Sequence, residues 1–261
     1  MSKLWQSYRT LNRYALRVFR RNLAVFRSTW KTNIAFNFLE PLLYLAAMGW
    51  GLGAFVGEID GMSYMQFIAP GIIASSAMWA ASAECTYESY VRMHYQKIFH
   101  AITATPINLD EVVTGELLTG VFKSVLYGSV ILLVIAVLGL VPSFFAVLIP
   151  LVLVLCGFVF AQLGMIWTGI VPKIDSFSYF FTLVVTPMFL FSGVFFPIDA
   201  LPEAVQAAAW LLPLYHIVVL LRSLTMGAVS AALLIHALWL VTFIIVIFPL
   251  PQHLMQKRLI K

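Results

Sequence analysis

The sequence predicts an all-α integral membrane protein that forms one transmembrane domain over residues 1–261. Two observations predict this fold class. Hydrophobic residues make up 62% of the chain and charged residues only 10%, whereas charged residues are about a quarter of a soluble domain. In addition, apolar stretches recur along the chain. Their length is close to the roughly 20 residues that a helix needs to cross a bilayer.

Six of these stretches are predicted to be transmembrane helices. Their boundaries are 33–55, 64–83, 112–140, 144–171, 177–196 and 230–251. Residues 197–226 do not form a clean span, because Pro197, Pro202 and Pro213 interrupt them. We expect two short helices here, forming an outer re-entrant hairpin whose non-helical backbone is covered by protein.

Residues 4–30 are predicted to form an N-terminal amphipathic helix on the membrane surface. Apolar side chains recur there at steps of three and four, and arginines fall on the other side. This pattern is typical of an interfacial helix, and each basic side chain near an anionic leaflet contributes about 1 kcal/mol. The membrane-surface residues are Arg9, Arg13, Arg17 and Arg20. Packing on a soluble partner is an alternative that is compatible with this one.

The long polar segment 84–111 separates the second and third predicted spans. We interpret it as a cytoplasmic loop, because it is too polar to lie in lipid, with a short helix in its middle that ends before Pro106. Our hypothesis is that a partner that supplies energy binds this helix, with the apolar Ile98 and Phe99 inserted into a groove on that partner. The alternative is an ordinary solvated loop.

Two charged residues fall within the third predicted span. Glu116 and Lys123 are seven residues apart and therefore lie on nearly the same helical face. A lysine at the centre of a span costs about 2.5–3.5 kcal/mol on insertion scales. We therefore expect Lys123 to lie toward the inner leaflet, paired or extended to the surface; a proton or ion relay is the alternative.

The distribution of basic residues predicts the orientation. With six spans, 14 of the 16 Lys and Arg residues fall on the side of the two termini and segment 84–111. The positive-inside rule places that side in the cytoplasm. The net charge of +5 thus reflects membrane orientation rather than nucleic-acid binding, and we expect a multi-pass protein of the bacterial inner membrane.

Known catalytic and nucleotide-binding patterns are missing from the sequence. The string nearest to a phosphate-binding loop, 115–124, has two residues inserted between its second glycine and its lysine. The five histidines are scattered, so no His/Cys set has metal-ligand spacing. We therefore expect a chain that is not an enzyme and holds no cofactor of its own.

The order of elements and several local strings resemble the membrane subunit of the ABC type-2 transporter permease family. The strings are Ser63–Gly71 (SYMQFIAPG), Thr105-Pro106, Phe191–Pro197 (FSGVFFP), and Pro213 followed by Arg222. The resemblance covers nearly the whole chain. Within the family, the sequence looks most like the NodJ-type branch, whose members export lipo-oligosaccharides.

This resemblance implies a fold like that of type V ABC exporters and a homodimer bound to two copies of a separate ABC ATPase, which carries the ATP and magnesium. The N-terminal helix would be the connecting helix and the helix in 84–111 the coupling helix. The implied ATPase contacts are Tyr95, Lys97, Ile98, Phe99, His100 and Ala101. The implied translocation path runs between the first, second and fifth spans and includes Tyr44, Met48, Phe177, Phe181 and Met188. An apolar outer gate would fall on Val194 and Phe195.

The resemblance therefore implies a permease that moves a lipid-linked or amphipathic glycan, or another lipid-like substrate, outward, using ATP hydrolysed by the partner subunit. Membrane lipids would surround the dimer. Two alternatives stay open: a membrane scaffold or assembly protein that uses the same surface without transport, and an exporter of hydrophobic drug-like compounds.

Overall fold

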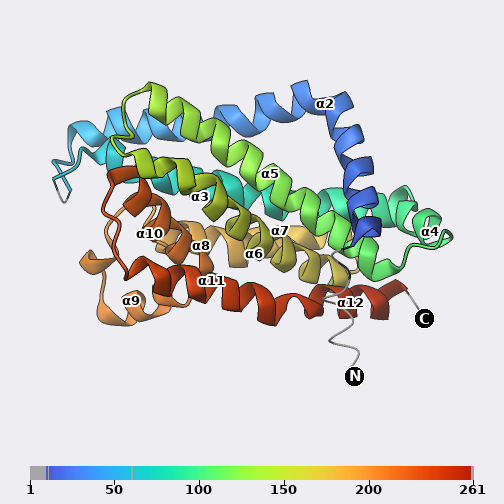
Figure 1. The fold of residues 1–261 in the computed structure, drawn as a ribbon. Helices are drawn as coiled ribbons and strands as arrows, with labels where there is room; N and C mark the ends of the chain where they lie inside the picture. Colours follow the sequence, from blue (N-terminus) through green and yellow to red (C-terminus); the bar gives the residue numbers. More distant parts are fainter. Residues whose placement is uncertain (1–9, 11, 60, 260–261) are drawn as a thin grey trace.

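The computed structural model describes residues 10, 12–59 and 61–259, and this part of the chain folds into a bundle of helices (Figure 1). Within this part of the chain, β-type pairing is limited to one isolated bridge, between Ile59 and Met62. The α-helices are α2 (Arg13–Ala46), α3 (Tyr64–Ala83), α4 (Ile98–Thr103), α5 (Leu109–Val137), α6 (Ile149–Ile170), α7 (Phe177–Phe180), α8 (Thr186–Phe191), α9 (Glu203–Trp210), α10 (Pro213–Met226), α11 (Leu233–Ile247) and α12 (Pro249–Leu259). The all-α prediction is confirmed.

Helix α3 occupies the centre of the bundle. It begins at Tyr64 because Ser63 and Gln66 form a capping box, in which each side chain accepts a hydrogen bond from the other residue's backbone N–H. Sixteen of its 20 residues are buried, and it packs against α5, α6 and α10. Its many Ala, Ser and Gly residues allow these neighbours to approach closely.

Among the described residues, four helical segments are long and apolar enough to cross a membrane, so the chain is a multi-pass membrane protein. They are Leu109–Val137, Phe144–Ile170, Ile174–Phe191 and Leu233–Leu259. Helices α9 and α10 form a fifth candidate that bends by 88°, as a broken span or a re-entrant loop would. The second half of α2 and helix α3 are less apolar than these four segments. In α3 the reason is its high content of small residues. The count of six spans therefore stays a prediction.

Helix α2 differs from the two separate helices predicted at 4–30 and 33–55. The helix is continuous from Arg13 to Ala46, and Figure 1 shows that it bends, so that its first half lies across the bundle and its second half runs along it. A π-helical turn, Ala47–Gly51, and a 3-10 turn, Leu52–Ala54, follow. The N-terminal part of the predicted interfacial helix, including Arg9, lies outside the described residues.

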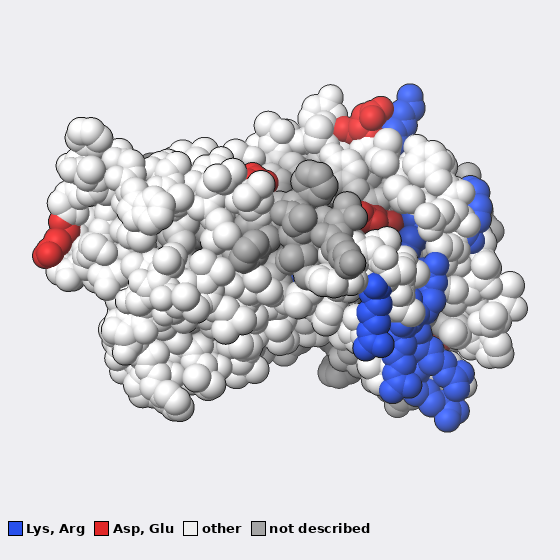
Figure 2. Space-filling model, turned by 90° about the horizontal axis from the view of Figure 1, so that it is seen from above, with Lys and Arg blue, Asp and Glu red and all other residues white. Residues whose placement is uncertain are grey.

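The first half of α2 is amphipathic, as predicted, but its buried face packs on the protein. Ala15 and Val18 are buried, and Val18 packs so closely on Gly115 of α5 that a Cβ there would lie 2.6 Å from it. Arg13, Arg17 and Arg20 are exposed. In Figure 2, Lys and Arg gather at the end of the molecule where this half of α2 lies, whereas acidic residues are visible at both ends.

The structure corrects the interpretation of residues 84–95 as a loop. The helical backbone of α3 continues through a π-helical turn at Glu84–Glu88 and a second one at Val91–Tyr95. We call residues 84–95 the α3 extension. The chain turns at Lys97, whose φ of 55° lies in the left-handed region, and α4 follows. The loop interpretation equated polarity with exposure, whereas the polar side chains of Glu84, Thr86 and Ser89 are buried in the protein.

We predict that Gly157→Ala destabilises the bundle. A Cβ at this position of α6 would lie 2.6 Å from the Cα of Val121 on α5, so the two helices must separate, at a cost of about 1–3 kcal/mol. Thermal unfolding in detergent should show a lower Tm. Gly51→Ala is the matched control, because a Cβ at Gly51 meets nothing within 4 Å. An unchanged Tm for Gly157→Ala would contradict this packing.

Candidate functional site

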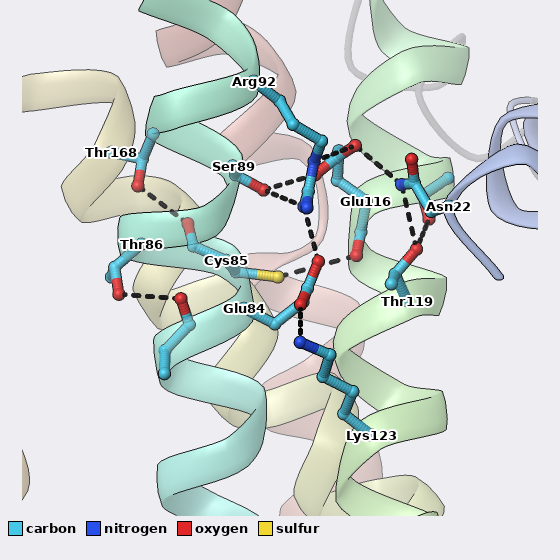
Figure 3. Close-up of polar contacts among 12 residues, drawn as sticks. Asn22, Glu84, Cys85, Thr86, Ser89, Arg92, Glu116, Thr119, Lys123 and Thr168 are labelled. Atoms are coloured by element: carbon cyan, nitrogen blue, oxygen red, sulfur yellow. Dashed lines mark hydrogen bonds and ion pairs between the residues drawn. The ribbon is translucent and has the colours of Figure 1, made fainter. Parts of the chain in front are cut away.

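A cluster of buried charges joins the α3 extension to α5 (Figure 3). At its centre, Arg92 forms salt bridges with Glu84 of its own helical segment and with Glu116 of α5. The Arg92 Nε atom donates to the Glu116 Oε2 atom at 3.0 Å. Both carboxylate side chains are 1% exposed, so their charges depend on partners within the protein.

Lys123 completes this cluster. Its ammonium group pairs with the second oxygen of Glu84 and lies 5.8 Å from the centre of the Phe26 ring on α2. The expectation that Lys123 is paired is therefore confirmed. Glu116 and Lys123 do share one face of α5, and Figure 3 shows both directed toward the α3 extension.

Polar side chains extend the cluster to a third element, α2. The Asn22 amide donates to Glu116 Oε1 at 2.8 Å and to the Thr119 hydroxyl at 3.1 Å. Ser89 donates to the second oxygen of Glu116. The first half of α2, the α3 extension and the start of α5 thus meet in one hydrogen-bonded unit, which we call the charge cluster: Asn22, Glu84, Ser89, Arg92, Glu116, Thr119 and Lys123.

The two cations balance the two carboxylates of the charge cluster. Burial raises the pKa of the Glu84 carboxyl, but the adjacent Arg92 and Lys123 outweigh this effect and hold its pKa below the usual range. Burial alone would lower the pKa of Arg92, yet Glu116 and Glu84 raise it further above its ordinary value. Glu84 and Arg92 therefore stabilise each other's ionised forms.

Helix α4 lies directly beyond this cluster, and the structure corrects one expectation about it. Phe99 is 1% exposed and packs in the core of its own chain, so its ring is not available to a groove on a partner. Ile98 is half-buried, whereas Tyr95, Lys97, His100 and Ala101 are exposed. A cleft of about 300 Å³ beside α4 is lined by His100, Pro106 and Leu259. A partner that binds α4 would meet these exposed residues.

The base of the α3 extension is also fastened to α6 and the C-terminal helix. The Thr168 hydroxyl donates to the Cys85 carbonyl at 2.7 Å, and Tyr90 donates to the Pro172 carbonyl at 2.8 Å. Arg258 of α12 donates to the Val171 carbonyl at 2.7 Å. The extension is thus held on two sides, which fixes the direction in which α4 projects.

A second cleft lies between α2, α3 and α8, where the translocation path was predicted. It has a volume of about 280 Å³ and is lined by aromatic, hydroxyl and carboxylate side chains, among them Glu40, Tyr44, Ser76, Trp79 and Thr186. Of the predicted path residues, Tyr44 lines the cleft. Phe181 stacks on Trp79, with the ring centres 5.0 Å apart. Phe177 is buried beneath Tyr87, and Met48 and Met188 are half-buried.

At the far end of the bundle, Val194 and Phe195 differ in exposure. Val194 is fully buried and packs so closely on α3 that a Cβ at Gly71 would lie 2.8 Å from it. Phe195 is half-buried, and its carbonyl accepts a hydrogen bond of 3.1 Å from the Tyr64 hydroxyl. Arg222 donates to the Gly193 carbonyl at 2.7 Å. The turn that carries the predicted outer gate is therefore held by α3 and α10.

Sequence reasoning missed the partners of Glu116 and Lys123, although a signal was present. From residue 72 to 105 the chain contains neither Gly nor Pro, so nothing in this stretch requires a helix to end at Ala83. If the helix continues, Glu84 and Arg92 lie on one face, eight residues apart. The same uninterrupted stretch would have predicted that both face α5.

Helices long enough to cross a membrane, with a buried charge cluster and a short helix at one end of the bundle, define a multi-pass membrane protein. The model of the ABC-2 type transporter family matches residues 15–226. The chain belongs to this family, and its membership implies a membrane component that works with an ABC ATPase subunit.

Several curated proteins are similar over nearly their full length. Nodulation protein J of Rhizobium leguminosarum bv. viciae is 38% identical over 247 residues, which are 94% of this chain and 95% of that protein. Nodulation protein J of Rhizobium meliloti (strain 1021) is 36% identical, covering 93% and 92%. The inner membrane transport permease YadH of Escherichia coli (strain K12) is 26% identical, covering 89% and 90%.

We predict that Arg92→Met destabilises the protein more than Lys123→Met. Loss of Arg92 leaves Glu116 buried without its cation, at a cost of about 3–5 kcal/mol, whereas loss of Lys123 leaves Glu84 paired with Arg92. Denaturant unfolding in detergent measures the difference. Lys97→Met, at an exposed position, is the control and should change stability by less than about 0.5 kcal/mol. Equal stability of all three variants would contradict the role of the charge cluster.

Proposed function

We propose that this chain is the permease subunit of an ABC exporter that moves a lipid-linked or amphipathic glycan outward. It acts as a homodimer with two copies of a separate ATPase, which hydrolyses the ATP. The observation that carries this proposal is the rigid connection between α4 and the bundle: α4 follows a helical extension that the charge cluster fixes to α2 and α5. A contact helix on such a support transmits force instead of absorbing it.

The placement of charges supports the orientation that this function requires. The exposed arginines of α2 lie at the same end of the molecule as α4, and basic residues favour the cytoplasmic face of a bacterial inner membrane. In this orientation both termini and α4 are cytoplasmic, and α4 faces the compartment that contains ATP. The arginines then lie at the level of the anionic inner leaflet.

The cleft between α2, α3 and α8 supports the substrate class. Trp79 and Tyr44 offer aromatic surfaces, while Ser76, Thr186 and Glu40 offer hydrogen-bonding groups within an apolar wall. Hydroxyl-rich rings combine apolar faces with many donors, and they match such a lining better than a purely apolar drug-like compound does. The similarity to nodulation protein J, at 36–38% identity, supports a place for this chain in the glycolipid-exporting branch of the family.

Co-reconstitution of the chain with its ATPase in liposomes tests the function directly. A fluorescent lipid-linked oligosaccharide in the inner leaflet should reach the outer leaflet with ATP, and not with a non-hydrolysable analogue. Stable association with the ATPase without nucleotide-dependent movement of any lipid-linked glycan would instead indicate a scaffold.

We predict that Ala101→Trp blocks binding of the ATPase and leaves the permease folded. Ala101 is exposed on α4, so a large ring there obstructs a docking surface without disturbing the core. Copurification measures binding, and the Tm of the permease reports folding. Ala231→Trp, also at an exposed alanine but at the start of α11, is the control and should bind normally. Normal copurification of Ala101→Trp would remove α4 from the contact.

We also predict that Val194→Ala and Phe195→Ala have different effects. Val194 is fully buried within one chain, so its truncation should lower the Tm without a leak. The half-buried Phe195 retains a surface that can close the path in the dimer, and its truncation should give leaky liposomes and looser coupling of ATP hydrolysis to export. Dye release and thermal unfolding separate the two effects. A tight Phe195→Ala variant would exclude this residue from the gate.

A further inference from the structure

An open cleft lies beside the charge cluster, between the first half of α2, the α3 extension and α5. Its volume is about 350 Å³. Its inner wall contains Glu84, Arg92 and Lys123, whose charges already neutralise one another together with Glu116. Two further charged side chains line the cleft, Arg21 from α2 and Glu88 from the extension, and they determine what it can bind.

Neither Arg21 nor Glu88 forms a salt bridge within the described part of the chain. Among the described residues, no carboxylate lies within 4.0 Å of the Arg21 guanidinium and no cation lies within 4.0 Å of the Glu88 carboxylate. One Arg21 nitrogen donates to Asn22 at 2.9 Å. Burial lowers the pKa of Arg21, although Glu116 opposes this effect, so the guanidinium has lost part of its hydration. The cleft therefore presents one cation and one anion to a ligand.

The rest of the lining combines uncharged polar side chains with an apolar flank. Val25 is 50% exposed, and Phe26 and Val91 add apolar surface. The cleft thus combines a polar pocket with an apolar flank. This combination suits a ligand that has a charged headgroup and a hydrocarbon tail.

The length of α5 places the cleft at the inner membrane surface. Its 29 residues span about 43 Å at 1.5 Å per residue, about 13 Å more than the hydrocarbon core. If α5 ends at the outer edge of the hydrocarbon, its first nine residues or so extend beyond the inner edge. Thr119 and Lys123, which line the cleft, then lie within the next two turns, just inside the inner hydrocarbon edge at the level of the upper acyl chains, with the headgroup layer directly beyond them.

We propose that this cleft binds an inner-leaflet phospholipid whose headgroup carries both a phosphate and a primary amine, with the phosphate at Arg21 and the amine at Glu88. Phosphatidylethanolamine has this chemistry, whereas phosphatidylglycerol has the phosphate alone. The acyl chains follow Val25 and Phe26 into the membrane. A lipid here fills the space between the first half of α2 and the charge cluster, and it acts independently of the transported substrate.

Native mass spectrometry of the delipidated full-length chain tests this assignment, with the two lipids added at matched acyl composition. We expect tighter binding of phosphatidylethanolamine than of phosphatidylglycerol. Arg21→Gln should weaken binding of phosphatidylethanolamine about tenfold, the effect of one charge-assisted hydrogen bond. Glu88→Gln should abolish the preference between the two lipids. Val25→Trp, which fills the cleft and keeps every charge, should weaken binding of both.

Lys173→Gln and Glu203→Gln are the matched controls, because both positions are exposed and neither lines the cleft; both should behave as the unmodified chain does. Unchanged binding in Arg21→Gln, or equal binding of the two lipids by the unmodified chain, would overturn the proposal. Displacement of the lipid by millimolar inorganic phosphate would also overturn it, because the cleft would then recognise phosphate without a lipid.

Discussion

The paired burial of Glu84 and Glu116 against Arg92 is the constraint on which the α4 end of this protein depends. A carboxylate that is 1% exposed is tolerated only when a cation and hydrogen bonds replace its hydration. Because these partners come from different segments, the requirement fixes the α3 extension against α5, and Asn22 adds α2 to the same unit. The position of α4 follows, since α4 begins where the fixed extension ends.

Different kinds of interaction hold the chain in place at the two ends of the bundle. At the end that carries α4, charged side chains satisfy one another. At the opposite end, Arg222 donates to the backbone carbonyls of Phe67 and Gly193 and lies 3.8 Å from the centre of the Phe67 ring. These contacts hold the turn at Gly193 against α3 and α10.

Much of the fold was predictable because hydrophobic length and helix caps are local signals. The predicted boundaries 64–83 are those of α3, and the shared face of Glu116 and Lys123 followed from helical periodicity. The α3 extension was misread because polarity was taken to mean exposure, whereas its carboxylates are neutralised by residues distant in sequence. The burial of Phe99 was likewise decided by tertiary packing. The span count is ambiguous for a related reason: α3 is surrounded by protein and therefore needs little apolarity of its own.

The continuity of α3 with its extension has a mechanical consequence. Residues 64–95 form one helical rod, about 48 Å long at 1.5 Å per residue, and its first residue, Tyr64, holds the Phe195 carbonyl. A tilt of about 5° at the end near α4 corresponds to a displacement of about 4 Å at the other end of a rod of this length. A tilt of the rod as one body would therefore move α4 and the turn at Phe195 together.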